Sequence, residues 1–173
     1  MAAVHRRTGC RVSLVTPVAG PIVQPFNSTI TGEVHHGIDI AADPGTPVVA
    51  PVDGTVLFAG FDDSGVGGGL MIRMVGDDQW QYVLVHLGSV SIGAGARVAA
   101  GQTIGTVAQP GTAEAGNAHQ AHLHFQVEAG RGNYIDPAPL LGGAVGVALA
   151  GVSSSALAAL ALLAFAAFVV SRI

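Results

Sequence analysis

The sequence predicts an all-β fold, an antiparallel β-sheet or sandwich, followed by a C-terminal apolar helix. Three observations carry this prediction. The 173 residues include 25 glycines and 9 prolines, which favours a loop-rich β domain. Short β-type runs recur between turn residues, as is typical of antiparallel sheets and sandwiches. No helical pattern of ordinary length precedes residue 140, whereas a long uncharged stretch lies beyond it.

The expected strands are runs of Val, Ile, Leu and aromatic residues, most of which are enriched in β-sheets. Gly and Asp separate the runs at points that favour turns, such as Asp53-Gly54 and Gly76-Asp77-Asp78. In chain order the runs are Val48–Ala50, Thr55–Phe58, Leu70–Val75, Trp80–Leu87 and Leu123–Val127. Their regular spacing predicts antiparallel pairing.

The composition changes near Pro137. No charged residue occurs from Pro137 to Ser171, and Ala156–Val170 contains only Ala, Leu, Phe and Val. This uncharged stretch exceeds the ~20 residues that a helix needs to cross a bilayer core. Because the helix is apolar on all sides, we expect it to span a membrane; a helix buried against other protein is the rival interpretation. The expected division is an extension at 1–16, a folded domain at 17–141 and the apolar segment at 142–173.

Charge and cysteine content exclude several classes of function. Charged residues make up 10% of the chain and the formal net charge is −4, so no basic field is available for nucleic-acid backbones. The chain has no lysine, and its seven cations are all arginines. Cys10 is the only cysteine, so an internal disulfide is impossible. The N-terminus does not read as a cleavable signal peptide.

Six of the seven histidines lie in or next to three short segments, which are His35–Asp39, Tyr82–Leu87 and His122–Phe125. Two imidazoles and one carboxylate bind zinc in many catalytic sites and leave a fourth position open. Histidines that do not bind the metal can move protons or hold an oxyanion. The clustering therefore predicts a zinc hydrolase.

His35 and Asp39 are four residues apart. On a straight strand they would be separated by about 13 Å, too far for one metal, at ~3.3 Å per residue. The chain must therefore bend between them, and Gly37 is the residue that permits a bulge or turn.

The other two segments read as strands. His122 and His124 share one strand face, while Leu123 and Phe125 face the core, so one histidine can bind metal while the other reaches the substrate. By the same alternation, Tyr82 and His86 lie on a common face. His36 falls on the wrong face for the metal, and His119 lies on a loop before the third segment, where it can contact the substrate.

The order and spacing of these motifs resemble the lysostaphin/LytM-type zinc metallopeptidases, which cut peptide bonds in bacterial peptidoglycan. The resemblance runs from about Pro17 to Leu141. It rests on Pro25-Phe26, His35–Ile40, Gly45–Val48, Ala50–Gly54, His86-Leu87, Gly95–Val98, Gly101–Gly105, His122–Phe125 and Asp136-Pro137.

The resemblance implies an all-β metallopeptidase domain with one zinc ion per chain, held by His35, Asp39 and His124. It also implies that His86 and His122 are the catalytic histidines. The chain departs from the family at Leu84, where an aromatic residue, often Tyr, is usual. Tyr82 is then the expected substrate contact on this strand, together with His119 from the loop.

The function implied is a zinc-dependent endopeptidase acting on stem or bridge peptides of peptidoglycan. With the apolar helix in a membrane, the catalytic domain would face the cell wall; a phage particle or lysis apparatus, with other subunits as partners, is the alternative setting. Degenerate members of the family, which have lost metal ligands, only activate other wall enzymes, whereas this chain keeps the full set. The alternative functions are a non-catalytic wall-binding or activator protein with a vestigial zinc site, or a structural component of a phage particle. A biotinyl or lipoyl carrier, suggested by Ala50–Val56 and Val98–Gly105, is excluded because such carriers need a lysine.

Overall fold

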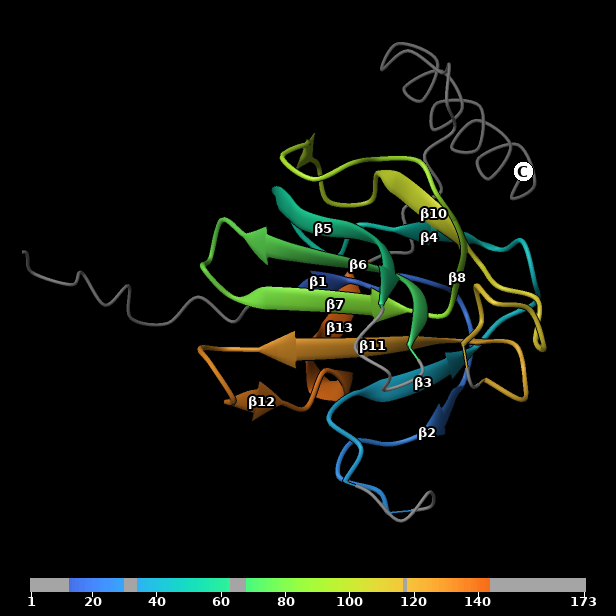
Figure 1. The fold of residues 1–173 in the computed structure, drawn as a ribbon. Helices are drawn as coiled ribbons and strands as arrows, with labels where there is room; N and C mark the ends of the chain where they lie inside the picture. Colours follow the sequence, from blue (N-terminus) through green and yellow to red (C-terminus); the bar gives the residue numbers. More distant parts are fainter. Residues whose placement is uncertain (1–12, 30–33, 63–67, 117, 144–173) are drawn as a thin grey trace, which may run out of the picture.

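The computed structural model describes residues 13–29, 34–62, 68–116 and 118–143, which form three β-sheets (Figure 1). The largest sheet has eight strands in the order β2-β3-β11-β7-β6-β5-β9, with β12 paired to β11, and all its pairs are antiparallel. Its strands are β2 (Ile22–Gln24), β3 (Ile38–Ala41), β5 (Gly54–Asp62), β6 (Gly69–Gly76), β7 (Gln81–Val85), β9 (Arg97–Val98), β11 (His122–Glu128) and β12 (Tyr134–Ile135).

Two smaller sheets complete the described structure. The antiparallel order β4-β10-β8 joins β4 (Pro47–Val49), β10 (Thr103–Val107) and β8 (Leu87–Val90). The second joins β1 (Leu14–Val15) and β13 (Leu141–Gly143) in parallel. The one helix among the described residues is a short 3-10 turn, η1 (Ala138–Leu140). The predicted all-β, largely antiparallel fold is therefore confirmed, and the parallel β1–β13 pair is an addition that the sequence did not indicate.

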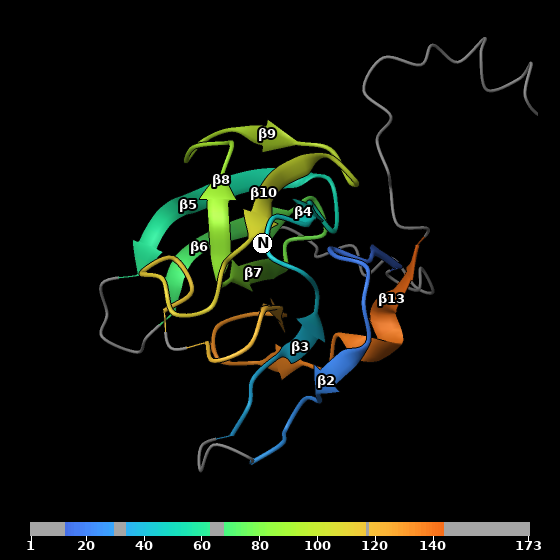
Figure 2. The same cartoon turned by 90° about the vertical axis from the view of Figure 1, so that its right-hand side faces the viewer.

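The core lies between the large sheet and the β4-β10-β8 sheet. The latter gathers near β5 and β6, and β2 and β3 lie at the opposite end of the large sheet (Figure 2). Along β11, Leu123, Phe125 and Val127 are fully buried, whereas the residues between them are only partly buried. This period-two alternation divides the large sheet into a core face and an outer face. Ile104 of β10 packs in the same core as the buried β11 residues.

Parts of the predicted organisation lie outside the described residues. They are most of the N-terminal extension, residues 1–12, and nearly all of the apolar segment, residues 144–173, including the expected transmembrane helix. Within the ranges that the structure describes, no helix has the length and apolar character needed to span a bilayer. The β1–β13 pair brings the two ends of the described domain together.

The structure places Tyr82 in the core rather than at a substrate surface. Its partner in the register is Val127 of β11, on the core face. Tyr82 is 0% exposed, its ring stacks at 6.4 Å on Phe125, and its hydroxyl donates to Asp78 Oδ2 at 2.5 Å. Burial, together with this hydrogen bond, raises the pKa of the Tyr82 phenol. The expected substrate contact is therefore not available from this position.

We expect Tyr82→Phe to lower the free energy of unfolding by about 1 kcal/mol, because the Asp78 carboxylate loses a buried hydroxyl donor. Chemical denaturation of the two proteins measures this difference. Tyr134→Phe is the matched control, since no hydrogen bond of its hydroxyl occurs within the described residues. Equal destabilisation by both substitutions would contradict the structural role given to Tyr82.

Candidate metal centre

The pairing of β3 with β11 creates the centre. Asp39 and His124 are direct cross-strand partners, so both side chains leave the same face of the sheet. This is the outer face, because the neighbouring pair Ile40 and Leu123 is buried in the core. His35 lies four residues before Asp39, and the chain bends at Gly37 between them, as the spacing predicted.

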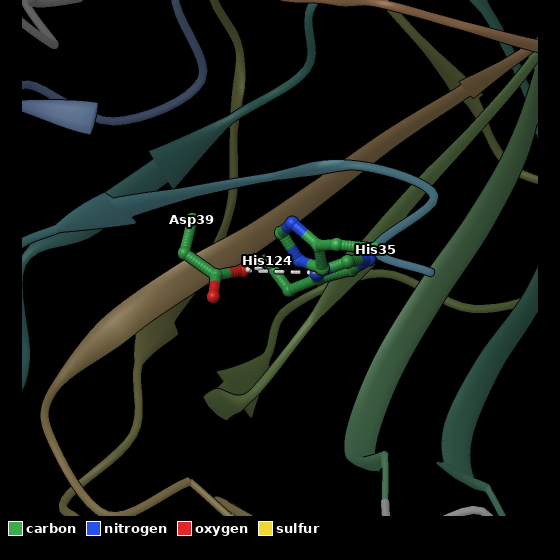
Figure 3. Close-up of side chains that lie close together, drawn as sticks. All are labelled: His35, Asp39 and His124. Atoms are coloured by element: carbon green, nitrogen blue, oxygen red, sulfur yellow. Dashed lines mark hydrogen bonds and ion pairs between the residues drawn. The ribbon is translucent and has the colours of Figure 1, made fainter. Parts of the chain in front are cut away.

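The three side chains converge on one small volume (Figure 3). His35 Nε2 lies 3.1 Å from Asp39 Oδ1 and 2.9 Å from His124 Nδ1, and His124 Nδ1 lies 2.9 Å from Asp39 Oδ1. Ligand atoms around a tetrahedral zinc are about 3.3 Å apart, given bonds of ~2.0–2.1 Å. The spacing therefore suits one small metal ion. These three form the metal-ligand set found among the described residues.

The donor chemistry also fits a cation. His35 Nδ1 lies 3.1 Å from the carbonyl oxygen of Pro25, which only accepts, so Nδ1 carries a hydrogen. In the neutral imidazole, Nε2 is then a lone pair that faces Asp39 and His124. Three electron-rich atoms this close repel one another unless a proton or a metal ion lies among them. Zinc would therefore be held by His35 Nε2, His124 Nδ1 and an oxygen of Asp39.

The pKa shifts point the same way. Burial works against the charged form of Asp39, but hydrogen bonds from His124 and His35 outweigh it and hold the pKa of the carboxyl well below its usual range. For His35, burial lowers the pKa, yet the hydrogen bond to Asp39 and the contact with Pro25 produce a net rise. The cluster thus keeps its carboxylate ionised and attracts positive charge.

Two further histidines adjoin the centre. His122 Nε2 lies 3.7 Å from Asp39 Oδ2, and its Nδ1 donates to the Gln120 carbonyl at 2.8 Å. The ring centroids of His86 and His122 are 4.7 Å apart, and His86 lies 6.3 Å from the ring of His124. The hydrogen bond to Gln120 fixes the tautomer of His122 so that Nε2 faces the centre as a proton acceptor.

His86 reaches the outer face through an unusual backbone conformation. Its φ is +64°, which is uncommon for a residue other than glycine and separates β7 from β8. Continued alternation would direct His86 into the core with Tyr82 and Leu84. The predicted strand Trp80–Leu87 is therefore broken at this residue, and the break gives His86 its place beside His122.

The environment of His86 keeps the ring neutral. Burial lowers its pKa to about 4, and repulsion from His122 and His124 adds to the effect. The Asp39 carboxylate and the backbone of Ala115 oppose this shift without cancelling it. A neutral imidazole has a single N–H, so His86 can donate to a developing negative charge when that N–H leaves the Ala115 backbone, and it suits an oxyanion donor rather than a fixed cation.

Gly37 has a second role that its spacing did not reveal. Its φ is ordinary, but a Cβ at this position would lie 2.5 Å from the carbonyl oxygen of Phe125 and 2.9 Å from Nε2 of His124. Glycine is therefore required for close approach between the His35 segment and β11. The glycine leaves space for the ring of a candidate metal ligand.

The two other histidines that the structure describes lie apart from the triad. His119 is exposed, and no hydrogen bond or ring contact ties it to the centre within the described chain. It lines a shallow depression together with Pro110, Gly111, Gly116 and Ala118. His36 is exposed and stacks on Tyr134 of β12, with ring centroids 4.0 Å apart and planes 7° from parallel. Sequence reasoning missed this stack, which ties the His35 segment to the β11–β12 hairpin.

Comparison with known proteins decides the family. Residues 33–137 match peptidase family M23. The chain belongs to this family. The matched region contains every candidate ligand and both candidate catalytic histidines, and members of M23 depend on zinc.

M23 relatives include both hydrolases and an activator. Glycyl-glycine endopeptidase ALE-1 of Staphylococcus capitis is 38% identical over 106 residues, 59% of this chain and 26% of that protein. Murein hydrolase activator NlpD of Escherichia coli is 28% identical over 121 residues, 70% of this chain and 29% of that protein. The crystallised catalytic domain of lysostaphin from Staphylococcus simulans is 31% identical, with a TM-score of 0.57, and the match covers 69% of this chain and 88% of that one.

The match covers only part of the relatives' length. The chain spans less than a third of the length of ALE-1 or of NlpD. The M23 match establishes the family, and among these relatives one is named as an endopeptidase and one as an activator of murein hydrolases. The activity of this chain is a separate question, which the geometry of its centre addresses.

We expect Gly37→Ala to reduce zinc binding, because the new Cβ must displace either the Phe125 backbone or the His124 ring. Isothermal titration with zinc measures the affinity. Gly93→Ala is the matched control, since a Cβ at that exposed glycine meets nothing within 4 Å. Unchanged zinc affinity in Gly37→Ala would show that the close approach does not position the ligands.

Proposed function

We propose that this protein is a zinc-dependent endopeptidase that hydrolyses peptide cross-links of bacterial peptidoglycan. One observation carries the proposal: a complete ligand triad lies on the outer face of the sheet with two further histidines beside it. A site that only held a metal for stability would tend to be closed by a fourth protein ligand. Zinc held by Asp39, His35 and His124 would have three protein ligands from the described chain, with His122 and His86 beside it to act on a bound water or substrate.

Each histidine outside the triad has a distinct role in this proposal. Bound zinc would polarise the scissile carbonyl and lower the pKa of a coordinated water to about 7. His122, with Nδ1 held by Gln120, presents Nε2 to receive a proton from the attacking water and return it to the leaving amine. Neutral His86 donates a hydrogen bond to the oxyanion that develops on the carbonyl.

The second candidate is a non-catalytic activator of other murein hydrolases. The match to NlpD favours it, because that protein is named as an activator. The convergence of the triad and the placement of both outer histidines favour the hydrolase. An activator has no need for a left-handed residue that re-aims His86 toward the centre.

Replacing His124 with Ala removes the ligand whose Nδ1 contacts both other members of the triad. We expect the variant to lose stoichiometric zinc and to release no fragments from purified peptidoglycan, whereas the wild type should hold one zinc per chain and release fragments. Metal analysis and mass spectrometry of released fragments provide the two readouts. His119→Ala is the control for zinc content, because no contact ties that exposed histidine to the triad within the described chain. A variant that holds one zinc per chain at normal affinity would overturn the ligand assignment.

His86→Ala and His122→Ala separate catalysis from metal binding. Each should retain one zinc per chain, because neither side chain belongs to the ligand triad. Each should lower kcat by about 10²–10⁴, the range typical of a lost general base or oxyanion donor. Loss of zinc from either variant would move that residue into the ligand shell, and full activity would remove it from the mechanism.

A further inference from the structure

The outer face of the large sheet continues beyond the metal centre. The row that contains Asp39 and His124 passes to Val85 of β7 and Met71 of β6. The next row along the strands contains Gln126, Val83, Arg73 and Phe58, on β11, β7, β6 and β5. Residues two apart on a strand share a face, so both rows lie on the face that carries the triad. A peptide that extends from the metal across β7 and β6 would pass over this face.

Arg73 is the cation of that surface that lacks a partner. It is exposed, and it makes no hydrogen bond or ion pair with any other described residue. Arg97 also lies on this face, through its register with Thr55, but it is occupied by Asp77 at 2.6 and 2.9 Å. The Glu128 carboxylate at the other end of the face accepts from the Gly132 amide. Among the described residues of this face, Arg73 is therefore the cation whose donors meet no acceptor.

The surroundings of Arg73 favour an anion. Its register partners are Val83, which is 4% exposed, and Phe58, which is 41% exposed, and Met71 two residues earlier is 6% exposed. These apolar side chains offer the guanidinium no hydrogen-bond acceptor, so its donors are left for a ligand. A guanidinium binds carboxylates through two parallel N–H donors.

The distance to the triad fits a single substrate peptide. Met71 is two strands from His124, or about 10 Å at ~4.8 Å per strand, and Arg73 is two residues further along. The Cα atoms of Arg73 and His124 are thus about 12 Å apart by sheet geometry. An extended peptide advances ~3.3–3.6 Å per residue. With the reach of the arginine side chain, the guanidinium meets a group one to three residues from the scissile bond.

We propose that Arg73 determines specificity by binding a free carboxylate of the substrate peptide, one to three residues from the bond that is cut. This inference rests on the proposed endopeptidase function. It names the substrate class as a carboxylate-bearing stem peptide rather than a glycine bridge, because glycine residues within a bridge carry no side-chain carboxylate. The bound group is either a side-chain carboxylate or the carboxylate that ends the peptide.

Three synthetic cross-linked peptides distinguish these cases. One has all carboxylates free, one has the side-chain carboxylate replaced by a carboxamide, and one has its terminal carboxylate amidated. We expect the zinc-loaded full chain to favour the free peptide over one amidated form by about tenfold in kcat/KM, the scale of a single charged hydrogen bond. The amidation that causes the loss identifies the source of the carboxylate.

The variants assign the effect to one side chain. Arg73→Gln should bring the ratio between free and amidated peptides close to one, and Arg73→Lys should retain part of it because charge remains without the planar fork. Arg97→Gln is the matched control and should keep the wild-type ratio. A wild type without preference, or an Arg73→Gln variant that keeps it, overturns the inference and leaves the endopeptidase function standing.

If the protein is not an endopeptidase, the results of the peptide experiment differ. In that case the zinc-loaded wild type cleaves none of the peptides, and isothermal titration of the same peptides then measures binding. A preference for the free carboxylate that disappears in Arg73→Gln would support the inference without hydrolysis. Equal binding of free and amidated peptides by both proteins would overturn it.

Discussion

The register between β3 and β11 is the constraint on which the rest of the site depends. It sets Asp39 opposite His124 on the outer face and Ile40 opposite Leu123 in the core. A shift of one residue would move every polar group of β11 into the core and every apolar group out of it. The burial of Leu123, Phe125 and Val127 therefore fixes the positions of Asp39 and His124, two of the candidate metal ligands. Stability and site geometry rest on the same alternation.

The third candidate ligand, His35, lies outside β3 and β11, and hydrogen bonds hold its segment in place beside them. The His35 amide donates to the Ser28 carbonyl, the Asn27 amide donates to the His35 carbonyl, and the His35 ring donates to the Pro25 carbonyl. Gly37 allows this segment to lie against the Phe125 backbone. The stack of His36 on Tyr134 adds an anchor from the hairpin on the other side. Several weak contacts thus hold a ligand that belongs to no strand.

Much of this site could be predicted from the sequence, because its chemistry resides in short segments. The spacing of His35 and Asp39 required a bend at Gly37, and alternation on the third segment separated His124 from Leu123. Tyr82 and His86 were expected on one face, and the structure separates them. The reason is the left-handed backbone of His86, for which the period-two pattern carries no signal. Tyr82 instead fills the core beside Phe125, which only the strand register reveals.

Other features depend on tertiary contacts that no local pattern encodes. The parallel β1–β13 pair joins segments from opposite ends of the described chain. Arg73 lies in a run that reads as an ordinary strand, and its relation to the triad becomes visible only when β6, β7 and β11 are placed in register. The same register places both arginines on one face, where Arg97 pairs with Asp77 and Arg73 has no partner among the described residues. The substrate surface is thus a property of the sheet rather than of a motif.

The central claim is that one zinc ion is held by the triad while both outer histidines stay free for chemistry. A crystal structure of the zinc-loaded protein, with anomalous diffraction recorded at the zinc edge, tests it most directly. The account predicts one strong peak within bonding distance of His35 Nε2, His124 Nδ1 and an oxygen of Asp39, with His86 and His122 outside that distance. A peak bonded to His86 or His122, or one located away from Asp39, would contradict it.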